Sequence, residues 1–321
     1  MTTPTINTKT TSKVSVRSLT ELESTGKHIT GDSGYSLTSK PEWFDQSRFD
    51  SGRKYAQKYV SLVYFSYQFL LVVGLTVVRF LDVLVWSDKS STGETSKDRY
   101  IRVFLHVHSW YVGDDIWNEI SESGKSIRKV RKIHNAMGKA YNKKMKPQDG
   151  VYMSQYDMAM VQAAFVAPPI LLGRALGFDE SELEHWCYFW RCLGYLLGID
   201  DEHNICNSKE QALKICYDVM YECVLPGLET PPPNFNPFWE YPSFPGKLTQ
   251  NGPITKNTIM TLIFDIFRRF LNKNDPFMGP DSRKGLRKWH LLTVKVLILW
   301  LRCLSCLYPA PLTCFIKWPT N

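Results

Sequence analysis

Apolar side chains recur at helical spacing through most of the chain, whereas the alternation typical of strands is nearly absent. The clearest stripe lies between residues 127 and 141, where apolar positions follow one face of a helix and basic residues crowd the other faces. The apolar members of this stripe are Ile127, Val130, Ile133, Met137, Ala140 and Tyr141. Because helical spacing dominates, the sequence predicts an all-α fold.

The most apolar stretch covers residues 59–86, and it is long enough to span a bilayer. Four residues make a membrane span unfavourable: the polar Gln68, the helix-weakening Gly74, and the charged Arg79 and Asp82. The pattern therefore favours two buried helices over a transmembrane segment.

Three further helices follow from the same spacing. One covers residues 97–110. A second covers residues 151–166, is interrupted or kinked at Pro168-Pro169, resumes over residues 170–176 and closes at Gly177. The third has a buried stripe that consists of Trp186, Phe189, Trp190, Leu193 and Leu197.

The chain has 321 residues, enough for two domains or one large one. Residues 1–40 are rich in Ser, Thr and Lys with few large apolar groups, so we expect them to be disordered or loosely attached. Residues 41–275 form the predicted helical domain. Residues 276–321 form an apolar tail whose 289–308 stretch contains Lys295 and Arg302, and both a membrane-surface helix and a buried helix fit it.

The chain is basic, with a net charge of +8. No motif that reads DNA or RNA accompanies this charge, so nucleic acid is not an expected partner, whereas an anionic membrane surface or an anionic cofactor accounts for it. The N-terminal segment lacks the apolar run of a signal peptide, and the eight cysteines include one Cys-x-x-Cys pair, Cys303 and Cys306, in apolar surroundings. We expect reduced, mostly buried cysteines and an intracellular location, at the endoplasmic reticulum or another membrane.

His134 is the candidate ligand residue, because it lies within the apolar stripe of the basic helix. One interpretation is a core histidine bonded to a carbonyl group. The other is a metal or haem ligand, since neutral imidazole is a good axial ligand for iron. Met137 and Gly138 lie one turn further on the same face, where a small residue lets a flat macrocycle approach, and Arg131 can reach an anionic group at its edge.

Three segments in order resemble the oxygenase family that includes the ER-bound mpaB enzymes and rubber oxygenase (latex clearing protein). Val130-Arg131-Lys-Ile-His134-Asn-Ala-Met137 is similar to that family's Val-Arg-x-x-His-Ala segment, with Asn135 in place of the alanine. The likeness continues in Met153-Ser-Gln155-Tyr156 and in the segment from residue 188 to residue 204, and it covers residues 45–225. It implies a globin-like helical catalytic domain that binds haem b, with His134 as the proximal iron ligand.

On the distal side that family has an Arg-x-x-Lys-Thr segment. Here Arg102 matches the arginine, but Leu105 and His106 stand in place of Lys and Thr, which leaves the distal chemistry open. Arg102 and His106 share a helical face and are the candidate catalytic residues, with an interior salt bridge as the alternative for Arg102. Arg191 is a further candidate, either for a haem propionate or for an acidic neighbour.

Two functions are expected, of which the first is implied by the resemblance. The first is an oxidoreductase, a haem-dependent oxygenase that uses dioxygen on an apolar, unsaturated or prenyl-type small substrate. The second is a non-catalytic membrane-associated helical protein that keeps the fold without haem. Other enzyme classes are weaker, because the chain has no Gly-rich phosphate loop, Gly-x-Ser-x-Gly elbow or His-Glu-x-x-His motif.

Overall fold

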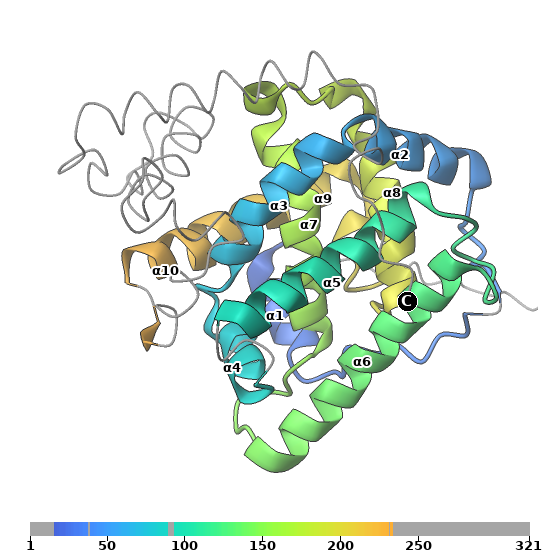
Figure 1. The fold of residues 1–321 in the computed structure, drawn as a ribbon. Helices are drawn as coiled ribbons and strands as arrows, with labels where there is room; N and C mark the ends of the chain where they lie inside the picture. The colour runs from blue at the N-terminus through green and yellow to red at the C-terminus, as the bar shows by residue number, and fades with distance from the viewer. Residues whose placement is uncertain (1–15, 38, 89–92, 231, 234–321) are drawn as a thin grey trace, which may run out of the picture.

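The computed structural model describes residues 16–37, 39–88, 93–230 and 232–233 (Figure 1). These residues form helices joined by short loops, with no strand among them, so the all-α prediction is confirmed. The longer helices are α1 (Leu19–Gly26), α2 (Gln46–Lys58), α3 (Val60–Gly74), α4 (Val78–Trp86), α5 (Gly93–Val112), α6 (Glu122–Met145), α7 (Gln155–Leu176), α8 (Leu183–Leu197) and α9 (Lys209–Asp218). The short helices are η1 (Glu180–Glu182), η2 (Ile205–Asn207), the π-helical η3 (Val219–Val224) and α10 (Leu225–Glu229).

Helix α8 lies at the centre of the core and carries the aromatic stripe that the sequence predicted. Trp186 and Phe189 are completely buried, and Trp190 is nearly so. Helix α2 packs against α8 at Gly52, where a Cβ atom would collide with the backbone of His185 and lie 2.6 Å from Cβ of Phe189. A glycine is therefore needed for this close approach of the two helices.

The cysteines in the described part of the chain have free thiols, as expected. They are Cys187, Cys192, Cys206 and Cys216, which are buried, and Cys223, which is partly buried.

Helix α7 continues through Pro168 and Pro169, so the predicted interruption is wrong. A proline at position 169 cannot donate to the carbonyl group four residues earlier, which is that of Phe165. The hydroxyl group of Tyr67 donates to that carbonyl oxygen instead, at 3.2 Å. A partner from α3 thus replaces the missing backbone bond, and the helix ends at Gly177 in the left-handed conformation, as predicted.

The apolar stretch of residues 59–86 forms two helices, α3 and α4, as predicted. They are separated at residues 75–77, directly after Gly74. In the part of the chain that the structure describes, no helix combines the length and the apolar character that a bilayer crossing requires.

The expectation of a disordered N-terminal segment is wrong for residues 16–37. Ser18 caps α1, whose Leu19 and Leu22 are buried in the core, and the backbone N–H of Leu19 donates to Asp218. The few apolar residues of this segment suffice because they recur at helical spacing.

Residues 1–15, most of residues 231–275 and the predicted apolar tail of residues 276–321 lie outside the described part.

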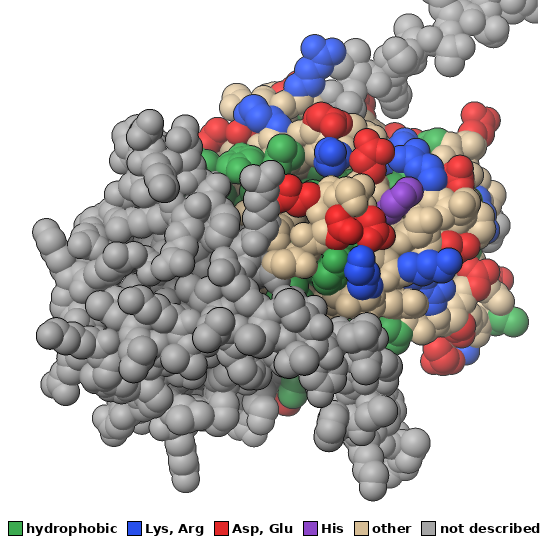
Figure 2. Space-filling view, turned by 90° about the horizontal axis from the view of Figure 1, so that it is seen from above, with side chains coloured by type: hydrophobic (Ala, Val, Ile, Leu, Met, Phe, Trp, Pro, Cys, Tyr) green, Lys and Arg blue, Asp and Glu red, His purple; other side chains and the backbone are tan. Residues whose placement is uncertain are grey.

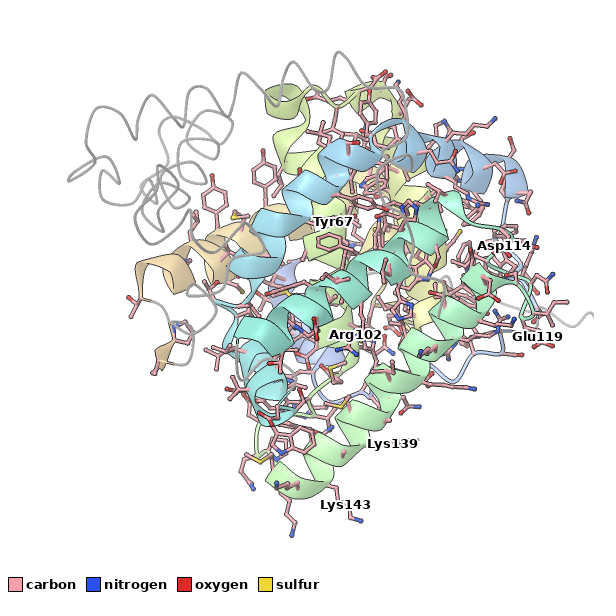
Figure 3. All side chains as sticks on the ribbon, viewed as in Figure 1. Tyr67, Arg102, Asp114, Glu119, Lys139 and Lys143 are labelled. Atoms are coloured by element: carbon pink, nitrogen blue, oxygen red, sulfur yellow. The ribbon has the colours of Figure 1, made fainter. Side chains whose placement is uncertain are left out.

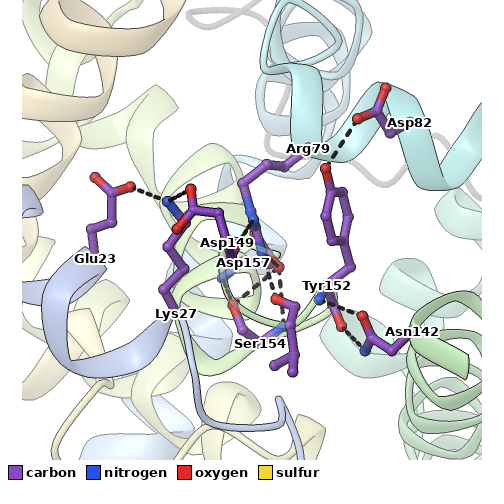
Figure 4. Close-up of polar contacts among 10 residues, drawn as sticks. Glu23, Lys27, Arg79, Asp82, Asn142, Asp149, Tyr152, Ser154 and Asp157 are labelled. Carbon is purple, nitrogen blue, oxygen red and sulfur yellow. Dashed lines mark hydrogen bonds and ion pairs between the residues drawn. The ribbon is translucent and has the colours of Figure 1, made fainter. Parts of the chain in front are cut away.

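Polar contacts fix the loop between α6 and α7 to its neighbours (Figure 4). The guanidinium group of Arg79 on α4 makes two bonds to the carboxylate of Asp157, at 2.7 and 2.9 Å. The same carboxylate accepts from the backbone N–H of Ser154, which closes a capping box at the start of α7. Helix α4 and the start of α7 are thus joined by a largely buried ion pair.

Helices α5 and α6 lie against each other and form the part of the fold that holds the candidate residues (Figure 1). The predicted helix around His134 is confirmed and is longer than predicted, because Ser121 caps it at residue 122. Helix α5 also begins earlier than predicted, at Gly93 rather than at residue 97.

Candidate functional site between α5 and α6

Helix α6 directs His134 towards the interior. Ile127, two turns earlier on the same face, is completely buried, and the ring of His134 is partly buried. The Nδ1 atom of His134 is fully enclosed and has no hydrogen-bond partner among the described residues. The carbonyl partner that a core histidine requires is therefore missing at this nitrogen.

The environment of His134 keeps its imidazole neutral. Burial, together with a smaller effect of the nearby His106, lowers its pKa from 6.5 to about 4. An imidazole that is neutral near pH 7 has a free lone pair, which a metal ligand requires.

This lowered pKa predicts acid sensitivity. As the pH falls below about 6.5, the unfolded chain takes up a proton at His134, whereas the folded chain does so only near pH 4. The stabilisation from neutral His134 is therefore complete above pH 6.5 and is lost as the pH falls through 4. Between pH 6.5 and pH 4, protonation of His134 in the unfolded chain should lower the free energy of unfolding by on the order of 3 kcal/mol. Urea denaturation at several pH values measures this loss. Equal slopes for the wild type and His134→Leu would contradict the assignment.

His106 on α5 lies at the contact with α6. Its Nδ1 atom is hydrogen-bonded to the hydroxyl group of Ser126 at 2.8 Å, and Nε1 of Trp110 donates to the same hydroxyl at 3.0 Å. Burial lowers the pKa of His106, and the charge of Lys129 adds to this effect. The structure therefore brings the two candidate histidines, His106 and His134, close enough for their charges to interact.

His108 faces a different neighbour, as helical geometry predicts for a residue two positions from His106. Its Nδ1 atom is hydrogen-bonded to the hydroxyl group of Tyr64 on α3, at 2.8 Å. The two histidines of the His-Val-His segment do not form a metal-binding pair.

Arg102 lies one turn before His106 on α5 (Figure 3). Its side chain is exposed, and Nε donates to the carbonyl oxygen of Asp98 in the same helix at 3.2 Å. The alternative of an interior salt bridge is therefore wrong, and the guanidinium group remains accessible to an anionic ligand.

Arg131 bonds to a carboxylate of the protein itself. Its Nε and Nη2 atoms bond to the carboxylate of Asp32, at 3.0 and 2.5 Å, and Asn135 donates to the other oxygen of that carboxylate at 2.8 Å. Burial raises the pKa of Asp32, but the bond from Arg131, the bond from the backbone N–H of Gly34 and the charges of Arg131 and Lys139 together lower it below the usual value. Sequence reasoning missed Asp32, because it lies in the segment that was expected to be disordered.

The space next to Gly138 is filled by the protein. A Cβ atom at this position would lie 2.9 Å from Cβ of Met153 and 3.3 Å from the carbonyl oxygen of Tyr152. The absence of a side chain thus lets the loop before α7 approach α6, and it does not leave room for a macrocycle there. Met137, one residue earlier, is partly buried.

Arg191 contacts an aromatic ring and an acidic residue. Its guanidinium carbon lies 3.9 Å from the ring centroid of Trp43, and Nη2 lies 3.9 Å from Oδ1 of Asp201. Burial lowers its pKa, against the effect of Asp201. Asp201 is thus the acidic neighbour that one of the two alternatives for Arg191 predicted.

No group of three or more His, Cys, Asp or Glu side chains within the described ranges is placed to hold a metal ion. No protein-family model matches the chain, and no curated protein or solved structure matches it.

Proposed function

We propose that this protein is a haem-dependent oxygenase that uses dioxygen on an apolar, unsaturated or prenyl-type substrate. The observation that carries the proposal is the enclosed, unpartnered Nδ1 atom of His134 on an imidazole kept neutral by burial. A buried polar atom without a partner costs about 1–3 kcal/mol, so its persistence calls for an explanation such as a ligand. Haem needs only one ligand residue from the protein, and His134 would be that residue.

The resemblance to the rubber oxygenase family supports the same assignment, because it independently selects His134 as the ligand and Arg102 as a distal residue. It also leads us to propose that the helical bundle is globin-like. This chain has Leu105 where that family has a lysine and His106 where it has a threonine. Burial lowers the pKa of His106, which favours its neutral form.

Three residues of the chain would have separate roles in this function. Bound haem would supply the activation of dioxygen. His134 would hold the cofactor, and His106, fixed by its bond to Ser126, would offer a neutral ring on the neighbouring helix. Arg102 is an exposed cation that would take an anionic group. Arg131 and Arg191 pair with Asp32 and Asp201, but Nη1 of Arg131 and Nε of Arg191 have no hydrogen-bond partner among the described residues.

The second candidate is a non-catalytic membrane-associated helical protein that keeps the fold without haem. Gly138 favours it, because the protein fills the space that a macrocycle was expected to use. The absorption spectrum of the purified protein in the presence of haem separates the two functions.

Arg102→Ala tests the oxygenase function. Loss of a bond to a charged group costs about 1.5–3 kcal/mol, so we expect at least about a tenfold lower turnover with haem still bound. Turnover is measured as dioxygen uptake by the haem-loaded protein with squalene, an apolar prenyl chain. Arg102→Lys keeps the positive charge and should retain part of the activity. Wild-type uptake in Arg102→Ala, or unfolding of this variant, contradicts the assigned role.

A further inference from the structure

The outer face of α6 is strongly basic. Glu122 is the single acidic residue of this helix, and it pairs with Lys125 at 3.0 Å. The other exposed charges on the helix are positive, and Lys139 and Lys143 project from its second half (Figure 3). The exposed basic side chains are Lys125, Lys129, Lys132, Lys139, Lys143 and Lys144.

Large aliphatic side chains lie exposed among these lysines. Ile120, just before α6, is 73% exposed, and Ile133 within α6 is 46% exposed. Both line a shallow groove of about 600 Å³ along the first half of the helix, whose charged lining consists of Lys125, Arg128, Lys129, Lys132 and one acidic residue, Glu119. Single exposed isoleucines are ordinary, but two that share one groove with lysines indicate a contact surface.

Helix α5 extends this surface. Ile101 is 46% exposed and Leu105 is 36% exposed, one turn apart on α5. The bond between His106 and Ser126 holds this part of α5 beside α6. We name the exposed aliphatic and basic residues of α5 and α6, with Ile120, the α5–α6 surface.

The α5–α6 surface differs from another face of the molecule in its charge pattern. On the face seen in Figure 2, acidic and basic side chains are interspersed over the described part. On α6 positive charges predominate, and aliphatic side chains lie between them. Mixed charges are ordinary for a protein surface, whereas lysines interleaved with isoleucines complement a partner that is both anionic and apolar.

We propose that the α5–α6 surface binds an anionic lipid bilayer, with its lysines at the headgroup phosphates and its isoleucines in the underlying acyl region. A bilayer offers both the negative charge and the apolar layer that this surface requires. Nucleic acid would use the lysines and leave the isoleucines in water, since an isoleucine offers neither a hydrogen bond nor a ring for stacking.

This inference goes beyond the proposed oxygenase function and does not depend on haem. It also has a consequence for that function, because His106 and His134 belong to the two helices that carry the surface. An apolar substrate dissolved in the bilayer would meet the protein next to these histidines.

The test compares the binding of the full chain to two kinds of vesicle: pure phosphatidylcholine, and phosphatidylcholine with roughly one third phosphatidylserine. The charge variant replaces Lys125, Lys129 and Lys132 by glutamine. Each basic residue near an anionic membrane strengthens binding about fivefold, so the preference for the anionic vesicles should fall about a hundredfold. The ratio of the two binding constants, anionic over neutral vesicles, cancels the part of binding that does not depend on lipid charge.

Two matched controls separate the surface from total charge and total hydrophobicity. Replacement of Lys54, Lys58 and Lys214, which are exposed on α2 and α9, by glutamine removes the same charge from helices outside the surface and should change the ratio little. Ile120→Ser with Ile133→Ser should weaken binding to the anionic vesicles about tenfold, whereas Ile29→Ser with Val78→Ser, also exposed, should not. Circular dichroism checks that each variant is folded.

Three results would overturn the proposal. One is an unchanged vesicle ratio in the Lys125, Lys129 and Lys132 variant. Another is an equal loss of the ratio in its charge control. The third is tighter binding to a duplex oligonucleotide than to anionic vesicles, which would assign the surface to nucleic acid.

Discussion

Asp157→Ala is expected to lower the free energy of unfolding by about 3–5 kcal/mol. Asp157 is almost completely buried and is bonded twice by Arg79, so its removal leaves a largely buried guanidinium group without its counter-ion. The same change removes the capping box of Ser154 at the start of α7. Urea denaturation at pH 7, followed by circular dichroism, measures the loss.

The matched control is Asp149→Ala, in a second ion pair of the same region (Figure 4). The carboxylate of Asp149 lies 2.6 Å from Nζ of Lys27 but is largely in solvent. Because exposed pairs contribute little, the denaturation midpoint of this variant should stay close to that of the wild type. Similar destabilisation by both substitutions would show that burial does not determine the strength of the two pairs.

His134→Leu is expected to abolish haem binding without destabilising the haem-free protein. Leucine fills a similar volume and has no polar atom, so the unpartnered Nδ1 atom disappears along with its energetic cost. We therefore expect a free energy of unfolding equal to or above that of the wild type at pH 7, measured without haem. A core histidine with a hidden hydrogen-bond partner gives the opposite result, a loss of about 1–3 kcal/mol.

Helical periodicity predicted much of the scaffold. The stripes of α6 and α8 were read from apolar spacing alone, and the two helices bury Ile127, Tyr141 and Trp186 as the spacing predicted. Ile133 and Ala140 of the predicted α6 stripe are exposed, so that part of the prediction is wrong. The inward direction of His134 follows from the same pattern. These features are local, since residues three or four positions apart share a helix face whatever the rest of the chain does.

Contacts between distant segments could not be predicted in this way. Arg131 and Asp32 are 99 positions apart, and nothing in either segment indicates the partner. The continuity of α7 through its prolines depends on the hydroxyl group of Tyr67, which belongs to another helix. Gly138 was read as room for a ligand, but the protein's own Met153 occupies that space.

In the candidate site, too, the local features could be predicted from the sequence, whereas the contacts between helices could not. Sequence spacing put Arg102 and His106 on one face of α5, and the structure has them one turn apart on that helix. Spacing could not show that Arg102 is exposed while His106 is held by Ser126 on α6, because both facts depend on how the two helices pack.

Titration of the purified protein with haem, followed by absorption spectroscopy, tests the central claim about His134 most directly. His185 is the control, because its Nδ1 atom is also enclosed and unpartnered among the described residues, but it lies on α8. We expect a Soret band in the wild type and in His185→Leu, and none in His134→Leu. No band in the wild type, or a band that persists in His134→Leu, would contradict the assignment of His134 as the haem ligand.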